Sequence, residues 1–145
     1  MDNIKAIFMD LDGTVLTSGH KVSKNLIKKL RELEGKGVKT FVATGRTFSS
    51  SKPFVEMLGI KNPVINYNGG RVVNPLNSEV IFEKPVEAQD VEELIKVSRE
   101  KGIHLNLYMD DKLYIEHETE EGEKYSESVE IPYYVRNFDE FIGKS

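Results

Sequence analysis

Two kinds of hydrophobic pattern alternate along residues 1–70. Short apolar runs, rich in β-branched and aromatic residues, are separated by stretches in which apolar residues recur every three or four positions. The runs predict strands and the stretches predict helices. Strands are expected at 4–9, 38–43 and 63–67, and helices at about 24–34, where Ser23 can act as the cap, and at about 49–58. Helices that connect successive strands in this way predict a parallel sheet with right-handed crossovers.

The pattern changes after Gly70, where hairpin-type strands replace the strand–helix alternation. Strands are expected at 71–74, 79–83, 103–109, 113–116 and 132–135, and helices at about 87–101, 118–127 and after Asn137. The sequence therefore predicts an α/β protein with a boundary near Gly70. Residues 1–70 would form a partial Rossmann-like core with parallel strands, and residues 71–145 a partial α+β module with antiparallel strands.

Composition places the chain among ordinary globular proteins. It has 145 residues, of which 39% are hydrophobic and 30% charged, enough for one domain or one domain with a small insertion. No apolar run approaches the roughly 20 residues that a membrane-spanning helix needs, and the N-terminus does not resemble a signal peptide. The chain contains no cysteine, which fits a reducing compartment. We therefore expect a cytoplasmic protein without a membrane partner.

The charge pattern argues against nucleic-acid binding, and the spacing of the histidines argues against a histidine metal site. The net charge of −4 arises from mixed signs without a basic block, so nucleic acid is not an expected partner. His20, His104 and His117 lie far apart and lack the spacing of metal ligands. We expect each of them to be a surface or sheet residue.

Polar side chains that could bind a ligand or take part in catalysis follow each of the first three predicted strands. Asp10 and Asp12 follow the first strand, Thr44 follows the second, and Asn68 follows the third. The carboxyl ends of parallel strands share one edge, where open α/β sheets bind ligands. Paired carboxylates there could hold a divalent cation, act as a nucleophile or transfer a proton. The alternative is a simple turn, because Asp and Gly are favoured turn residues.

The segment DLDGTVL at 10–16, followed by VATGR at 42–46, resembles the first two motifs of the haloacid dehalogenase (HAD) superfamily. The segment NYNGG at 66–70 is similar to the Cof-type subgroup, subfamily IIB, in which a large C2-type cap follows the third strand. The resemblance covers essentially the whole chain as the N-terminal portion of such a protein. It implies a magnesium-dependent phosphatase that acts on a small phosphorylated metabolite, such as a sugar phosphate, through an aspartyl phosphate.

The resemblance also assigns roles to individual residues. Asp10 would be the nucleophile, with one carboxylate oxygen on Mg²⁺. Asp12 would protonate the leaving oxygen and then deprotonate the attacking water, while its backbone carbonyl binds the metal. The phosphoryl group would be bound by Thr44 and by backbone N–H groups around Leu11, Asp12 and Gly45. Arg46 and Asn68 would contact the substrate or fix the rim of the site, and for Arg46 pairing with an acid is an equal alternative.

Two further motifs of the superfamily are not recognisable: a lysine, and an acidic pair that completes the magnesium site. Asp110 and Asp111 lie between two predicted strands, where a hairpin turn explains both of them. Lys84 follows a predicted hairpin strand and not a core strand. The interpretation is therefore a truncated or split phosphatase with weak or no activity alone. The alternative is a non-catalytic phosphate-binding or assembly module.

The first predicted strand is expected to have a free edge. In the family topology, strands that are missing here would pair with this strand on the side away from the second strand. An apolar, unpaired edge is a template for pairing, which predicts self-association or a second polypeptide there. A two-component receiver domain, the remaining alternative, needs an Asp at the third strand end, where this chain has Tyr67, Asn68 and Gly69.

Overall fold

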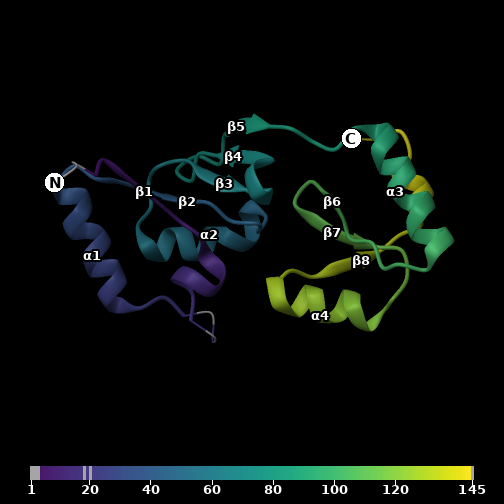
Figure 1. The fold of residues 1–145 in the computed structure, drawn as a ribbon, viewed down its shortest axis with the longest axis horizontal. Helices are drawn as coiled ribbons and strands as arrows, with labels where there is room; N and C mark the ends of the chain where they lie inside the picture. The colour runs from purple at the N-terminus through teal and green to yellow at the C-terminus, as the bar shows by residue number, and fades with distance from the viewer. Residues whose placement is uncertain (1–3, 18, 20, 145) are drawn as a thin grey trace. The chain divides into compact units, whose positions relative to one another are not determined.

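The computed structural model describes residues 4–17, 19 and 21–144 (Figure 1). The chain divides into two compact units, unit 1 at Met1–Lys84 and unit 2 at Pro85–Ser145. The sequence predicts a boundary near Gly70, whereas unit 1 continues through the next hairpin. The reason is that the hairpin extends the sheet of unit 1 by pairing with its third strand.

Unit 1 begins with the predicted alternation of strands and helices. Its elements are β1 (Ala6–Met9), the turn η1 (Leu11–Val15), α1 (Lys24–Gly35), β2 (Lys39–Val42), α2 (Phe48–Leu58) and β3 (Val64–Asn66). Strands β1 and β2 pair in parallel, and a parallel bridge between Ala43 and Ile65 continues the arrangement toward β3. The predicted parallel α/β arrangement is therefore confirmed.

Local signals in the sequence set the ends of both helices. The Ser23 hydroxyl accepts a hydrogen bond from the Asn25 N–H at 3.3 Å at the start of α1. The Thr47 hydroxyl likewise accepts from the Ser50 N–H at 3.1 Å at the start of α2. Gly59 ends α2 in the left-handed conformation, with φ of 73°. Such caps satisfy backbone groups that a helix end leaves unpaired, so the strand–helix connections are well defined.

A hairpin completes unit 1. After the short helix η2 (Tyr67–Gly69), β4 (Arg71–Val73) pairs antiparallel with β3, and β5 (Val80–Glu83) pairs antiparallel with β4. The core of this unit is formed by buried side chains from its strands, helices and connecting segments: Met9, Leu11, Val15, Leu16, Leu30, Val42, Phe48, Phe54, Val55, Leu58, Ile60, Val64 and Val73. This core fixes the carboxyl ends of β1, β2 and β3, where the candidate site lies.

Unit 2 is a small sheet with two helices. Its elements are α3 (Ala88–Lys101), β6 (Leu107–Met109), β7 (Lys112–Ile115), α4 (Glu120–Val129), β8 (Tyr133–Val135) and the short helix η3 (Phe138–Phe141). Strand β6 is shorter than the predicted 103–109, and β8 pairs in parallel with β7 because α4 forms a crossover between them. Ile95, Phe138 and Phe141 form the centre of its core. Within the described residues, no helix is long and apolar enough to cross a membrane.

Candidate functional site

The turn after β1 carries the two carboxylates of the first motif. Two backbone hydrogen bonds close this turn, from the Val15 N–H to the Asp10 carbonyl at 3.3 Å and from the Leu16 N–H to the Leu11 carbonyl at 2.8 Å. The Leu11 side chain is fully buried beneath the turn, while Asp10 and Asp12 are exposed. The sequence folds in this way because one apolar residue between two acids anchors the turn and leaves both acids facing water.

Backbone hydrogen bonds bring the three strand ends together. The Ala43 N–H donates to the Met9 carbonyl at 2.9 Å, and the Thr44 N–H donates to the Ile65 carbonyl at 2.9 Å. The Asn68 N–H then donates back to the Thr44 carbonyl at 3.2 Å. Thr44 is 4% exposed, so its hydroxyl is held within the protein at the edge where the carboxylates lie.

Gly45 lets Asn68 approach the second strand end closely. A β-carbon placed on Gly45 would lie 3.1 Å from the Asn68 Oδ1, closer than side chains normally approach. Asn68 itself has a left-handed backbone, with φ of 53°, a conformation that Asn tolerates better than most residues. The segments VATGR at 42–46 and NYNGG at 66–70 therefore lie against each other.

Arg46 connects the first motif with the second. Its Nε donates to Asp12 Oδ2 and its Nη2 donates to Asp12 Oδ1, both at 2.8 Å. Its Nη1 donates to the Ser50 Oγ at 2.9 Å, and its guanidinium lies over the Phe54 ring, 5.3 Å from the centroid. The Arg46 side chain is 3% exposed and the Asp12 side chain 49% exposed. A buried cation thus holds a half-exposed carboxylate in one orientation.

This ion pair corresponds to one of the two readings of Arg46 that the sequence leaves open. A contact between Arg46 and a substrate stays a prediction, as do the phosphate contacts of Leu11, Thr44, Gly45 and Asn68. Each Asp12 oxygen accepts one hydrogen bond from Arg46, and a carboxylate offers about four acceptor positions in all. The pairing with Arg46 by itself uses two of these positions.

A group of buried polar residues behind this ion pair is not predicted from the sequence. Asn66 and Ser51 are fully buried, and the Asn66 amide Nδ2 donates to the Ser51 Oγ at 2.9 Å and to the Arg46 carbonyl at 3.1 Å. The signal that could have found Asn66 is strand alternation, because Val64 and Asn66 face the same side of β3 and Val64 is buried.

The other candidate residues lie apart from this constellation. Asp110 and Asp111 form the tight turn between β6 and β7, with φ of 52° and 59°. Across the described part of the chain there is no cluster of three or more His, Cys, Asp or Glu suited to a metal ion. His104 bonds Thr119 and Asn106 within unit 2, and His20 lies outside the described residues.

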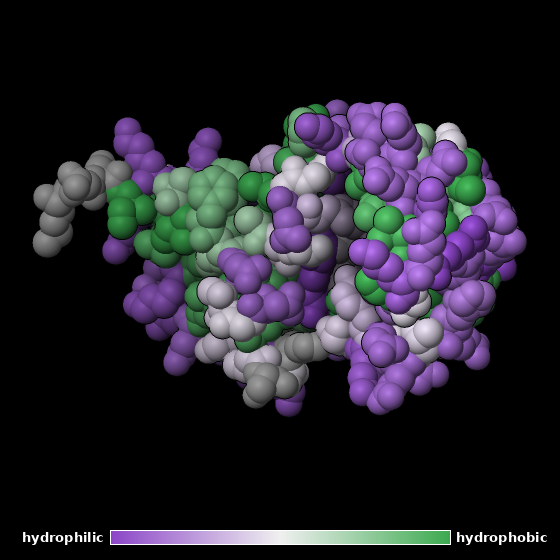
Figure 2. Space-filling view, turned by 45° about the vertical axis from the view of Figure 1, so that its right-hand side comes forward, coloured by the Kyte–Doolittle hydropathy of each residue, from purple (hydrophilic) through white to green (hydrophobic). Residues whose placement is uncertain are grey.

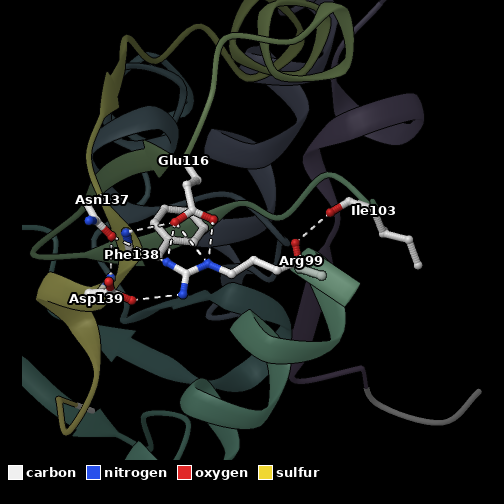
Figure 3. Close-up of polar contacts among 7 residues, drawn as sticks. Arg99, Ile103, Glu116, Asn137, Phe138 and Asp139 are labelled. Carbon is white, nitrogen blue, oxygen red and sulfur yellow. Dashed lines mark hydrogen bonds and ion pairs between the residues drawn. The ribbon is translucent and has the colours of Figure 1, made fainter. Parts of the chain in front are cut away.

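A second arginine network occurs in unit 2 (Figure 3). From α3, the Arg99 guanidinium reaches the Glu116 carboxylate with its Nε at 3.1 Å and the Asp139 Oδ1 with its Nη1 at 2.8 Å. Glu116 also accepts from the Phe138 N–H at 3.3 Å, and these hydrogen bonds, chiefly the one from Arg99, lower the pKa of its carboxyl. This network joins α3, the residue that follows β7, and the short helix η3.

Comparisons with known proteins agree with the strand-end motifs. A family model described as haloacid dehalogenase-like hydrolase matches residues 7–144. A pyridoxal phosphate phosphatase from Escherichia coli is 30% identical over 115 residues, which cover 79% of this chain and 42% of that protein. A 5-amino-6-(5-phospho-D-ribitylamino)uracil phosphatase from Bacillus subtilis is 27% identical over 99 residues, which cover 68% of this chain and 37% of that protein.

A solved phosphatase structure from Bacteroides thetaiotaomicron superposes with a TM-score of 0.79 at 29% identity, covering 94% of this chain and 51% of that one. The chain spans about half the length of the relatives it matches. The family match extends over both units. The chain therefore belongs to the haloacid dehalogenase-like hydrolases, and it resembles their Cof-type phosphatases.

Proposed function

We propose that this chain carries the phosphoryl-accepting part of a cytoplasmic, magnesium-dependent phosphatase for small phosphorylated metabolites. The observation that carries the proposal is the bidentate hold of Arg46 on Asp12, two residues from the exposed Asp10 at the end of β1. Such a hold keeps the second carboxylate in a fixed position beside the first. Positioning and charge stabilisation are the main needs of phosphoryl transfer.

In the proposed reaction, a carboxylate oxygen of Asp10 attacks the phosphorus atom and the ester P–O bond breaks. The leaving oxygen takes a proton from Asp12, which gives the free alcohol and an aspartyl phosphate. Water then attacks phosphorus and passes its proton to the Asp12 carboxylate. This second step releases inorganic phosphate and restores Asp10. The Thr44 hydroxyl and the N–H groups of Leu11 and Gly45 would hold the phosphoryl oxygens.

The donor set at the turn fits a magnesium ion. Mg²⁺ prefers hard oxygen ligands and keeps several of its waters, so one or two carboxylates and a substrate phosphate are enough to hold it. The Asp10 carboxylate is exposed at the turn, and the Asp12 backbone carbonyl is the second donor that we assign. When bound, the ion would neutralise charge on the phosphoryl oxygens.

Two relatives support the proposed substrate class, and the motifs that are not recognisable here limit the expected rate. The Escherichia coli and Bacillus subtilis relatives are phosphatases of small phosphorylated compounds, which supports the same class here. The sequence offers no recognisable lysine or further acidic pair at a core strand end. We therefore expect slow turnover from the 145-residue chain alone.

A panel assay tests the proposal. The chain is incubated with Mg²⁺ and with sugar phosphates or pyridoxal phosphate, and released phosphate is measured for the wild type and for Asp10→Asn. We expect release that depends on Mg²⁺ and is lost by at least about 100-fold in the variant, since the nucleophile is removed. Equal release by both proteins would contradict the proposal. Binding of beryllofluoride without turnover would instead favour a non-catalytic phosphate-binding module.

We further propose that the free edge of β1 is an association surface for a second copy or a second polypeptide. Within the described residues β1 pairs only with β2. Phe8 on β1 is 59% exposed and stacks on Phe41 with ring centroids 4.6 Å apart, and Ile4 is 65% exposed. Figure 2 shows hydrophobic atoms gathered at the left, on unit 1. Analytical ultracentrifugation tests this proposal, and a monomer at micromolar concentration would contradict self-association.

A further inference from the structure

We propose that Asn66 is a positioning residue for Asp12 and acts through Arg46. The inference rests on the proposed phosphatase function, in which Asp12 is the proton donor and acceptor. Asn66 does not touch Asp12. Its amide holds the backbone of Arg46, and the Arg46 side chain holds the Asp12 carboxylate.

The orientation of the Asn66 amide is fixed by its two partners. Its Nδ2 lies 3.1 Å from the Arg46 carbonyl, which can only accept a hydrogen bond. Its other partner, the Ser51 Oγ at 2.9 Å, donates its own proton to the Phe48 carbonyl at 3.2 Å and therefore also accepts. Both partners thus require the NH₂ end of the amide, and the reversed amide would place oxygen against oxygen.

Arg46 is consequently held at both ends. The Tyr67 N–H also donates to the Arg46 carbonyl, at 3.2 Å, and the Arg46 N–H donates to the Thr44 Oγ1 at 3.2 Å. At the other end, Ser50 and the Phe54 ring fix the guanidinium. Because its backbone is fixed in this way, the Arg46 side chain can reach only a limited region, and the Asp12 carboxylate lies within that region.

Asn66 carries an energetic cost that a residue with only a packing role would not need. Among the described residues, the Asn66 Oδ1 is buried and has no hydrogen-bond partner. A buried polar atom without a partner destabilises the fold, whereas an apolar residue of similar volume at this position would avoid that penalty. Val64, two residues earlier on the same face of β3, is a buried apolar side chain. The donor end of Asn66 is the feature that a valine or leucine could not supply.

The experiment follows the Arg46 Nε–H by NMR in the full 145-residue chain. Its exchange with solvent is measured in the wild type, in Asn66→Ala and in the isosteric Asn66→Asp, and the signal is assigned by its loss in Arg46→Lys. We expect exchange to be faster by about tenfold in both Asn66 variants, the change that corresponds to one lost hydrogen bond of ordinary strength. The readout does not depend on activity, so it stands or fails separately from the proposed phosphatase function.

Val64→Ala is the matched control, because it removes buried volume from the same face of the same strand without touching Arg46. We expect it to lower the global stability of the chain while exchange at the Arg46 Nε–H changes by less than about twofold after correction for that stability. Exchange that is unchanged in Asn66→Ala, or that rises equally in Val64→Ala, would overturn the proposal. Should both Asn66 variants fail to fold, Ser51→Ala decides, since it removes one acceptor of the Asn66 amide. A rise in Arg46 exchange supports the proposal, and no change overturns it.

Discussion

A bidentate arginine–carboxylate pair occurs in each unit, and the pairs Arg46–Asp12 and Arg99–Glu116 are built in opposite ways. In unit 1 the Arg46 side chain is 3% exposed and Asp12 is 49% exposed. In unit 2 the Arg99 side chain is 40% exposed and Glu116 is 14% exposed. The first arrangement anchors the cation in the protein and presents the carboxylate to solvent. The second anchors the carboxylate and leaves the cation outside.

This difference separates a pair that can do chemistry from a pair that holds elements together. A carboxylate that reaches solvent can meet a substrate, and a buried guanidinium fixes where it points. The Glu116 carboxylate is largely covered, and it accepts hydrogen bonds from the Arg99 guanidinium and from the Phe138 N–H at the start of η3. An arginine paired with a carboxylate thus indicates a candidate site in unit 1 and a contact between α3 and η3 in unit 2.

The two units also differ in charge. Unit 1 has 13 Lys and Arg against 8 Asp and Glu, and unit 2 has 7 against 16. The overall value of −4 hides this contrast. A positive field around unit 1 would favour the approach of phosphorylated anions, and its effect would weaken as salt increases.

Removing each arginine gives the largest expected difference between the units. Arg46→Met should destabilise unit 1 by about 2–3 kcal/mol, because buried hydrogen bonds to Ser50 and packing on Phe54 are lost along with the ion pair. Arg99→Met should destabilise unit 2 much less, because partly exposed ion pairs contribute little to stability. Hydrogen exchange of backbone amides in each unit measures both changes. Equal losses of stability in the two variants would contradict the difference that we infer between the two ion pairs.

Asp12→Asn should separate stability from function. Since Asp12 is half exposed, the substitution should cost less than about 1 kcal/mol in urea unfolding. Phosphate release should nevertheless fall by about 100-fold, because the proposed proton donor is gone. A stable variant that keeps its full rate would show that Asp12 is a structural partner of Arg46 only.

Acid should weaken unit 2 through Glu116. Hydrogen bonds, chiefly from Arg99, lower the pKa of Glu116 below its ordinary value of 4.5 in the folded state. Its stabilising contribution is therefore complete above that value and is lost as pH falls through the lowered pKa. In urea unfolding between pH 7 and pH 3, the wild type should lose more stability than Glu116→Gln, which lacks this titration. Parallel loss in both proteins would argue against the Glu116 contribution.

Gly45→Ala should have the smallest effect on stability and a selective effect on the site. The new methyl group would meet the Asn68 Oδ1 at 3.1 Å, and Asn68 is exposed and can move away. We expect phosphate affinity to fall severalfold with little change in stability. Gly35→Ala is the control, because a methyl group there meets nothing within 4 Å and Gly35 is the last residue of α1. It should leave stability the same or slightly higher, without changing phosphate binding.

The sequence predicts the outline of unit 1 well because its signals are local. The strand runs, the cap Ser23 and the polar residues at each strand end are all read from neighbours in the chain. The contact between Asp12 and Arg46 spans 34 positions, so the sequence leaves the partner of Arg46 open. Asn66 looks like one more strand residue until its burial is known, since its partners come from α2 and the preceding loop.

Unit 2 is predicted less well for the same physical reason. Residues 103–106 alternate as a strand would but have no partner strand in the described structure, so β6 forms only at Leu107–Met109. The parallel pairing of β8 depends on the crossover through α4, and no short-range pattern encodes it. Arg99 and Glu116 lie 17 positions apart and become neighbours only after folding.

In the proposed mechanism, Asp10 accepts a phosphoryl group and Asp12, held by Arg46, completes the cycle. Mass spectrometry of the intact chain, quenched in acid after incubation with Mg²⁺ and a phosphorylated substrate, tests it most directly. With a substrate whose leaving group needs no proton, only the second step requires Asp12, so we expect the mass of one added phosphoryl group on Asp12→Asn and none on Asp10→Asn. Phosphorylation of Asp10→Asn to the same extent, or its absence from Asp12→Asn and the wild type alike, would contradict this mechanism.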